Sequence, residues 1–481
     1  MNHKLVCKIL GFILWIEAVC LLAPLGIAIF TGGSDVIGFA ATIAICAVLG
    51  AVLSVLGRGH ARMQARDGFA AVGLGWIGLS AFGALPYCIS GAIPHYVDAF
   101  FETVSGFTTT GATILSEIES LPRGILFWRA ETQWMGGMGV LVLTLALMPK
   151  LGEGALYLMQ AESPGPVVSK LVPKVGDTAK ILYGIYVGLT VAETICLCLA
   201  GMPLYESLTH AFTTISTGGF SVKNASIAAY DSELINWIII VFMFLSGINF
   251  SLLYASLHRK FKSVIKSEEL QLYTVLAVGA TLLICLNLYI EFGTPLGKSF
   301  SESAFQVVSI MTTTGYATAD YALWPAFSQT MLILVMFVGA CAGSTAGGVK
   351  CSRIVLLFKA LRRELRKVIH PREVNVIRCD GRKVEESTLY SVHIFFFAYV
   401  VILLLGTLVV SWDNLGFDTA FSATLTCLSN VGPGLAAVGP VENFGMLSYV
   451  SKMVLSFAML LGRLEIVPLL VLLFPSLWKR R

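Results

Sequence analysis

Thr108-Thr109-Thr110-Gly111-Ala112-Thr113 is the first of four related segments on which the interpretation of this chain depends. The others are Ile215-Ser216-Thr217-Gly218-Gly219-Phe220, Thr312-Thr313-Thr314-Gly315-Tyr316-Ala317 and the more divergent Ser429-Asn430-Val431-Gly432-Pro433-Gly434. Aligning Gly111, Gly218, Gly315 and Gly432 gives spacings of 107, 97 and 117 residues. One such segment alone is best explained as a polar turn between helices. Four of them, each between a short helix-like stretch and a long apolar one, predict a shared role.

Hydroxyl-rich loops that end in glycine have the composition needed to hold a dehydrated cation. Removing water from a cation is costly, so a dry passage must supply oxygens in its place, as potassium channels do with backbone carbonyls. Glycine lets carbonyls point inward because it adopts φ angles that other residues avoid. The sequence therefore predicts a ring of cation-binding residues. Its predicted members are Thr109, Thr110, Gly111, Ser216, Thr217, Gly218, Thr313, Thr314, Gly315, Asn430, Val431 and Gly432.

The composition indicates an integral membrane protein. Of the 481 residues, 56% are hydrophobic and 13% are charged, whereas soluble globular domains carry about 25% charged residues. The eleven cysteines form no CxxC pair and no metal-ligand spacing, so they are interpreted as buried hydrophobic residues. No HExxH, GxSxG or P-loop motif is present. We therefore expect a protein that is not an enzyme, with no organic cofactor and no nucleic-acid partner.

The apolar pattern predicts an all-α polytopic fold with an N-terminal two-helix hairpin and four similar units. Each unit has an outer helix, a half-helix, a glycine loop and an inner helix. The half-helices are too short for a bilayer core of about 30 Å, so they should enter it and turn back. The predicted boundaries are 1–68 for the hairpin and 69–150, 151–266, 267–383 and 384–481 for the units. Continuous inner helices are predicted at 124–148, 235–257 and 447–473, with an interrupted one at 326–358.

The distribution of basic residues predicts the orientation. If the N-terminus is cytoplasmic, 27 of the 33 Lys and Arg residues fall in inside segments, eleven of them from Lys350 to Lys383. Both termini are then cytoplasmic and the four glycine loops lie toward the outside. The predicted outer loops carry acidic residues that should attract cations: Glu117, Glu119, Asp231, Glu233, Glu302, Asp320, Asp418 and Glu442.

Together these features resemble the TrkH family, the membrane subunits of bacterial potassium transporters in the Trk/Ktr/HKT superfamily. The resemblance spans essentially the whole chain, and Asn430-Val431-Gly432-Pro433-Gly434 is its most specific motif. It implies that the four units surround one pore with pseudo-fourfold symmetry, and that the ring residues form its K⁺ filter. It also implies gated, channel-like K⁺ uptake across the bacterial inner membrane, a homodimer, and control by a cytoplasmic nucleotide-binding ring, TrkA in this family. In plant HKT relatives a serine in the first loop marks sodium preference, so glycine at Gly111 favours potassium. A proton- or sodium-coupled symporter is the alternative, for which Glu17, Glu131 and Glu193 are the obvious titratable candidates.

Two features are candidates for a gate. Arg463 lies in an apolar run, where a charge costs about 2.5–3.5 kcal/mol on insertion scales. It is either a positive barrier below the ring, which the family resemblance supports, or a partner of Glu131 or Glu193 in an ion pair. Gly343-Ser344-Thr345-Ala346-Gly347-Gly348 interrupts the third inner helix, because glycine-rich segments hold helical structure poorly. We interpret it as an intramembrane gate loop, with close helix packing as the alternative.

The basic segment from Lys359 to Lys383 is amphipathic. A solvated cytoplasmic helix or a contact with the headgroups of the lipid bilayer is the default interpretation. Docking of the regulatory ring is the alternative, and the sequence does not separate the two.

Overall fold

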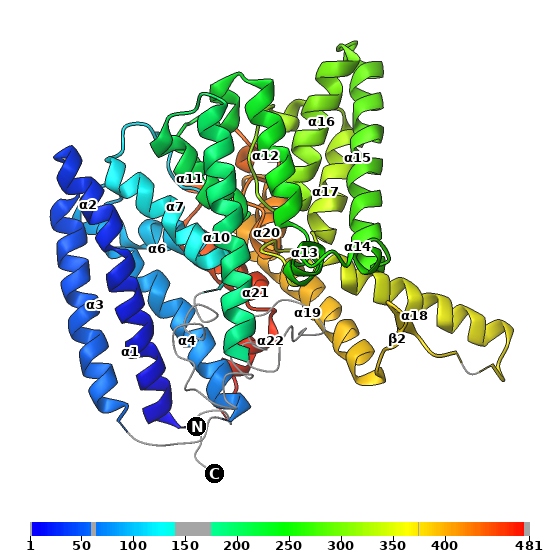
Figure 1. Ribbon diagram of the computed structural model, residues 1–481, viewed down its shortest axis with the longest axis horizontal. Coiled ribbons are helices and arrows are strands. Elements are labelled where there is room, and N and C mark those ends of the chain that lie inside the picture. The colour runs from blue at the N-terminus through cyan, green and yellow to red at the C-terminus, as the bar shows by residue number, and fades with distance from the viewer. Residues whose placement is uncertain (1, 59–63, 140–174, 374, 476–481) are drawn as a thin grey trace.

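The computed structural model describes residues 2–58, 64–139, 175–373 and 375–475. The end of the first predicted inner helix, the loop that follows it and the last six residues lie outside this range. The described chain is almost entirely helical (Figure 1). It also contains an antiparallel hairpin that the sequence did not predict, in which β1 (Arg378–Cys379) pairs with β2 (Arg382–Lys383).

The N-terminal helices form a hairpin that packs on the first unit. α1 (His3–Cys20) and α2 (Leu22–Thr31) together form one apolar span, and α3 (Val36–Leu56) returns beside α1. The turn between them is anchored by Asp35, whose buried carboxylate accepts a hydrogen bond from Ile125 N (3.1 Å). This contact holds the hairpin against α7 (Arg123–Gly137), the first inner helix.

Each glycine-bearing segment directly follows a short helix at the predicted place. These half-helices are α6 (Tyr96–Phe107), α11 (Leu204–Ile215), α16 (Leu296–Met311) and α20 (Phe417–Ser429). The longer outer helices that precede them are α4 (Ala65–Gly83) with its continuation α5 (Leu85–Ile89), α10 (Val175–Leu199), α15 (Glu268–Phe292) and α19 (Glu386–Val410). Short 3-10 turns lie in the connections, at Ser226–Tyr230, Tyr321–Leu323, Ser411–Asp413, Ala436–Val438 and Phe444–Met446.

The prediction of continuous inner helices was wrong for the second and fourth units. The second is α12 (Glu233–Ser246) followed by α13 (Phe250–Leu257), with a bend of 101° between them. The fourth is α21 (Tyr449–Arg463) followed by α22 (Val467–Leu472). The residues on either side of each break are largely apolar, so hydropathy alone suggested one continuous helix. At the breaks, Asn249 caps α13 by accepting from Ser251 N (2.8 Å), and Glu465 and Ile466 adopt positive φ angles.

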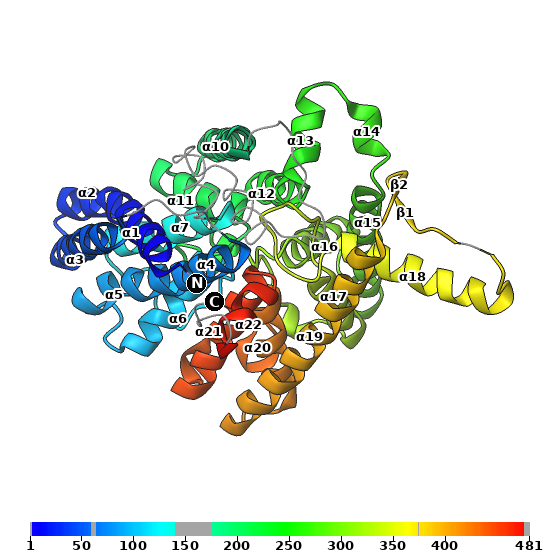
Figure 2. The same ribbon diagram turned by 90° about the horizontal axis from the view of Figure 1, so that it is seen from below.

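The third inner helix is interrupted, as the sequence predicts, but over a longer stretch. α17 (Ala326–Val338) ends before Gly339, and α18 (Cys351–Ile369) begins after Lys350. α18 projects away from the rest of the molecule in both views (Figures 1 and 2), and the short α14 (Phe261–Ile265) lies before α15. The 339–350 segment between α17 and α18 is therefore a non-helical link inside the bundle.

The molecule is a multi-span helical bundle. Six helices of the described residues are long and apolar enough to cross a membrane, and there are seven if the bent pair α12–α13 counts as one. Figure 1 shows the start of α1 and the end of α22 at the same end of the molecule. Seen from that end (Figure 2), α4–α7, α10–α13, α15–α18 and α19–α22 follow one another around the centre, with the N-terminal hairpin outside the first group.

Candidate functional site

The four glycine-bearing loops share one backbone conformation. The first residue of each loop has a left-handed φ between 54° and 57°, in Thr109, Thr217, Thr313 and Asn430. The next residue donates its N–H to the carbonyl five positions earlier, at 2.8–2.9 Å, in Thr110, Gly218, Thr314 and Val431. The third residue has a φ between 78° and 103°, in Gly111, Gly219, Gly315 and Gly432. Three matching features at each loop establish the register among the four.

This register corrects the sequence alignment of the second segment. Gly219, not Gly218, is the counterpart of Gly111, and the matching triplet is Thr217-Gly218-Gly219. Ser216, predicted as a ring residue, instead occupies the position that ends the half-helix. The alignment failed because two adjacent glycines offer no sequence signal for which of them takes the left-handed φ.

The loops follow one another in a closed ring. A Cβ on Gly111 would overlap the carbonyl oxygen of Gly218, and one on Gly219 would overlap that of Thr314. The same relationship joins Gly315 to Val431 O, and Gly432 to Thr110 O. Each glycine therefore lies directly against the middle carbonyl of the next loop. Only a residue without Cβ permits this approach, so the ring order is first, second, third, fourth and back to first.

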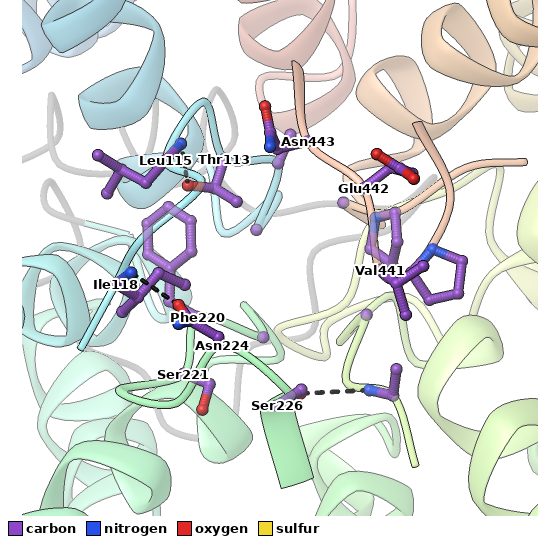
Figure 3. Close-up of a pocket in the computed structure, with 18 of the residues that line it drawn as sticks. Thr113, Leu115, Ile118, Phe220, Ser221, Asn224, Ser226, Val441, Glu442 and Asn443 are labelled. Atoms are coloured by element: carbon purple, nitrogen blue, oxygen red, sulfur yellow. Dashed lines mark hydrogen bonds between the residues drawn. The ribbon is translucent and has the colours of Figure 1, made fainter. Parts of the chain in front are cut away.

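A cavity of about 150 Å³ opens on one side of the ring (Figure 3). Its lining includes the ring glycines Gly111, Gly219, Gly315 and Gly432. Phe220, Asn224, Val441 and Asn443 also line it (Figure 3). Of the eight acidic residues predicted at the outer mouth, only Glu442 lines this cavity. Some of the others form contacts away from the cavity. Glu233, for example, accepts a hydrogen bond from Ser301 Oγ (2.6 Å).

A buried ion pair that the sequence did not single out supports the first two loops. Arg129 Nη2 lies 2.8 Å from Glu102 Oε1. Glu102 also accepts from Thr113 Oγ1 (2.9 Å) in the first loop, and Arg129 Nη1 donates to Ser221 O (3.2 Å) after the second. The guanidinium stacks over the Phe220 ring at 4.1 Å. The charged residues within α6 and α7 were the available signal, but the sequence did not reveal that Glu102 and Arg129 would meet.

The 339–350 segment lies against the other side of the ring. Gly347 N donates to Thr313 Oγ1 (2.7 Å), and Thr217 Oγ1 lies 3.3 Å from Thr345 Oγ1. A Cβ on Gly347 would overlap Ser429 O, at the start of the fourth loop. The predicted gate segment from Gly343 to Gly348 therefore contacts the second, third and fourth loops.

Hydrogen bonds hold this non-helical segment in place. Glu269, which the sequence did not single out, accepts from Ala342 N (2.6 Å) and from Ser352 N (3.1 Å). Gly343 O accepts from Phe250 N (3.0 Å), just after the bend between α12 and α13. The Lys350 ammonium donates to Ala346 O and the Ser344 hydroxyl to Cys341 O. Irregular backbone at membrane depth requires such internal partners.

Arg463 connects the same segment to the first inner helix. Its Nη1 donates to Thr345 O (2.6 Å), and its Nη2 lies 2.5 Å from both Gly136 O and Gly137 O. The sequence left two interpretations open, a positive barrier and an ion pair with Glu131 or Glu193. The contacts described here are to main-chain carbonyls and not to either glutamate. Gly136 also packs closely, because a Cβ there would overlap Phe107 O. A fixed positive charge therefore lies beside Thr345, on the side of the ring away from the cavity.

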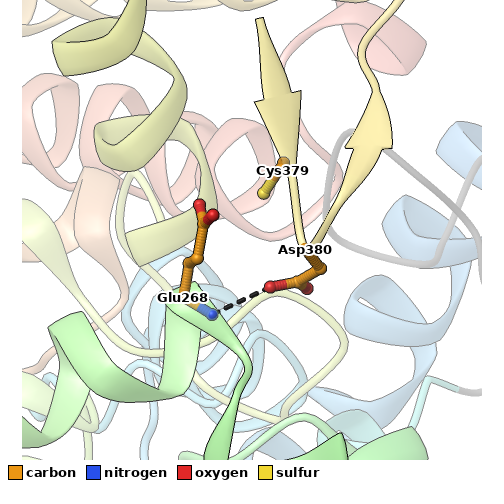
Figure 4. A group of neighbouring side chains, drawn as sticks. All are labelled: Glu268, Cys379 and Asp380. Carbon is orange, nitrogen blue, oxygen red and sulfur yellow. Dashed lines mark hydrogen bonds between the residues drawn. The ribbon is translucent and has the colours of Figure 1, made fainter.

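One cluster of possible metal ligands occurs among the described residues, and none of its members belongs to the ring segments. Glu268, Cys379 and Asp380 meet where the β hairpin contacts the start of α15 (Figure 4). Asp380 Oδ1 accepts from Glu268 N (2.8 Å), and the Glu268 carboxylate pairs with Lys359. Burial raises the pKa of the Cys379 thiol to about 11. The cluster is therefore best explained as the anchor of the hairpin.

Comparisons with known proteins point to one family. The model of the family described as "TrkH: Cation transport protein" matches residues 37–480. The Trk system potassium uptake protein TrkH of Salmonella typhimurium is 38% identical over 489 residues, which cover 100% of both chains. TrkG of Escherichia coli is 35% identical over 480 residues, 99% of each chain. The crystal structure of the potassium transporter TrkH from Vibrio parahaemolyticus superposes with a TM-score of 0.89 at 36% identity and covers 100% of both chains.

Proposed function

Because this chain belongs to the TrkH family of cation transport proteins, we propose that it takes up K⁺ across the bacterial inner membrane through a gated, channel-like pore. It is a multi-pass membrane protein of a transporter family and not an enzyme. The full-length relatives are potassium uptake proteins of the Trk system. That similarity supports K⁺ as the transported ion.

The closed ring of four loops is the observation that carries this proposal. It supports a pseudo-fourfold arrangement of four units around one pore, with the ring as the selectivity filter. The middle carbonyls of the loops lie next to one another, each beside a glycine of the neighbouring loop. Carbonyls gathered in this way replace the hydration shell of a cation. The cavity over the four glycines then serves as the outer vestibule, and the termini are cytoplasmic.

The segment from Gly343 to Gly348 and Arg463 form the gate in this proposal. The segment lies against the ring on the side away from the vestibule, and Arg463 bonds to Thr345 of that segment, so a passing ion meets them after the filter. The guanidinium adds a positive barrier, and movement of the segment would open the path. A cytoplasmic nucleotide-binding ring like TrkA is the proposed regulator, and a homodimer is the proposed assembly.

Proton-coupled symport is the second candidate function. Both carboxylate oxygens of Glu17 are buried, and neither has a hydrogen-bond partner in the part of the chain that the structure describes. A buried carboxyl group without a partner is suited to bind a proton. Single-channel recording in a planar bilayer distinguishes the two functions, because channel-size unitary currents exclude a slow coupled cycle.

Replacing Gly111 with Ser tests the filter. The purified protein is reconstituted in liposomes, and the ratio of K⁺ to Na⁺ flux is measured. We expect the ratio to fall, because a Cβ at Gly111 displaces the carbonyl of Gly218. Gly201→Ser is the control, since Gly201 also has a positive φ but no atom lies near its missing Cβ. An unchanged ratio in Gly111→Ser would remove the assignment.

A further inference from the structure

The side-chain amide of Gln133 binds the second loop of the ring at two points. Gln133 lies on α7 and is fully buried. Its Nε2 donates to Gly218 O (2.7 Å), and its Oε1 accepts from Phe220 N (3.0 Å). These contacts determine the orientation of the amide. In the reverse orientation the amide oxygen would face the carbonyl oxygen of Gly218, and the amide nitrogen would face the N–H of Phe220.

This contact makes the ring unequal. Gly218 O is one of four equivalent carbonyls, together with those of Thr110, Thr314 and Val431. In the described part of the chain, Gly218 O is the member of this set that receives a hydrogen bond. Its electron density is therefore shared with an amide donor, whereas the other three remain available for a cation.

The second and fourth inner helices carry an apolar residue at the position of Gln133. Gly137 packs against Ser216, and Gly247 packs against Thr312, which is the counterpart of Ser216 in the next loop. Four residues before Gly247 is Met243, as Gln133 is four before Gly137. Gly136 and Gly462 likewise pack against the end of their own half-helices, and three residues before Gly462 is Met459. Met243 and Met459 are both fully buried. The amide at Gln133 is thus a departure from the pattern of the second and fourth units.

We propose that Gln133 is a positioning residue that weakens cation binding in the ring by holding the Gly218 carbonyl in a hydrogen bond. The inference rests on the proposed function, because it assumes that the ring carbonyls bind K⁺. A filter must bind an ion strongly enough to admit it and weakly enough to release it. One engaged carbonyl of four shifts that balance toward release.

Gln133→Met is the direct test, because methionine has a similar volume and already occupies the equivalent positions of the second and fourth units. The full-length chain is reconstituted in liposomes, and K⁺ flux is measured against K⁺ concentration. We expect the half-saturating concentration to fall on the order of fivefold, as one hydrogen bond to the ring is lost, and the maximal flux to fall because release slows. A half-saturating concentration that stays level or rises would overturn the proposal. Thr132→Val is the control: it removes a buried hydroxyl that donates to Arg129 O of the same helix.

Gln133→Glu provides a second, independent readout. When the carboxyl group is protonated it can donate to Gly218 O and accept from Phe220 N as the amide does, so half-saturation at low pH should match the native protein. When it ionises the donor is lost, so half-saturation should fall as pH rises. The native protein and Gln133→Met should show no such profile. A flat profile in Gln133→Glu across a pH range in which its carboxyl group ionises would overturn the proposal even if Gln133→Met does not fold.

The outcome for Gly111→Ser separates the two levels of inference. If Gly111→Ser changes the K⁺ to Na⁺ ratio while the Gln133 variants behave as the native protein, the ring is the filter and only the role of Gln133 is wrong. If neither set of variants changes selectivity or half-saturation, the filter assignment itself fails.

Discussion

Arg129 Nη2 and Glu102 Oε1 lie 2.8 Å apart, and both side chains are buried. The pair joins the half-helix α6 to the inner helix α7 and also contacts Thr113 and Ser221, in the segments around the first two loops. It is the kind of buried pair that is costly to break from one side, because the remaining charge has no solvent to stabilise it.

Glu102→Gln should therefore destabilise the protein by about 3–5 kcal/mol. Thermal unfolding in detergent measures the change. The double variant Glu102→Gln with Arg129→Met should be less destabilised than Glu102→Gln, since no buried charge is left unpaired. Lys298→Met is a control that breaks the exposed Lys298–Glu302 pair and should have little effect. Equal stability of Glu102→Gln and the native protein would contradict this role.

Gly219→Ala should abolish most K⁺ flux. Gly219 has a φ of +78°, and a Cβ there would overlap the carbonyl of Thr314, a predicted ring oxygen. Gly91→Ala imposes similar backbone strain, with φ +76°, but meets no atom near its Cβ. Flux in liposomes should survive Gly91→Ala. If both variants conduct equally well, the close approach at Gly219 has no bearing on the path.

Gly347→Ala should raise flux in the absence of any regulatory partner. A Cβ at Gly347 would overlap Ser429 O, so the gate segment could no longer lie fully against the ring. Basal K⁺ leak from liposomes is the measurement. Gly184→Ala serves as the control because nothing lies near its missing Cβ. A leak no greater than that of the native protein would favour a packing role for the segment.

Arg463→Ala should also raise flux, since it removes both a positive charge and the bonds to Thr345, Gly136 and Gly137. Arg463→Lys keeps the charge but offers a compact ammonium in place of the planar fork. If charge is the barrier, Arg463→Lys should stay close to the native flux. If Arg463→Ala lowers flux or leaves it level, the residue is structural rather than a barrier.

The half-helices were predicted well from the sequence, because the residues at their ends mark where each helix begins and stops. α6 begins and ends where the sequence predicts, at Tyr96 and Phe107, and glycine-rich loops follow all four half-helices. The breaks within the second and fourth inner helices were missed, because the largely apolar stretches on either side of them suggested one continuous helix. The break at Gly247 is held by a contact from a distant segment, since Gly247 O accepts from Cys341 N (3.1 Å).

The amino-acid sequence was sufficient for the helical class, the recurrence of the glycine loops and the interruption before Lys350, since hydropathy and glycine content act over short distances along the chain. The closed ring order, the choice of Gly219 over Gly218, and the meeting of Gln133 with Gly218 or of Arg463 with Thr345 required the tertiary structure. Each of these joins residues from separate helices through backbone carbonyls, and carbonyls are the same in every residue. No side-chain pattern can therefore encode which of them will be engaged.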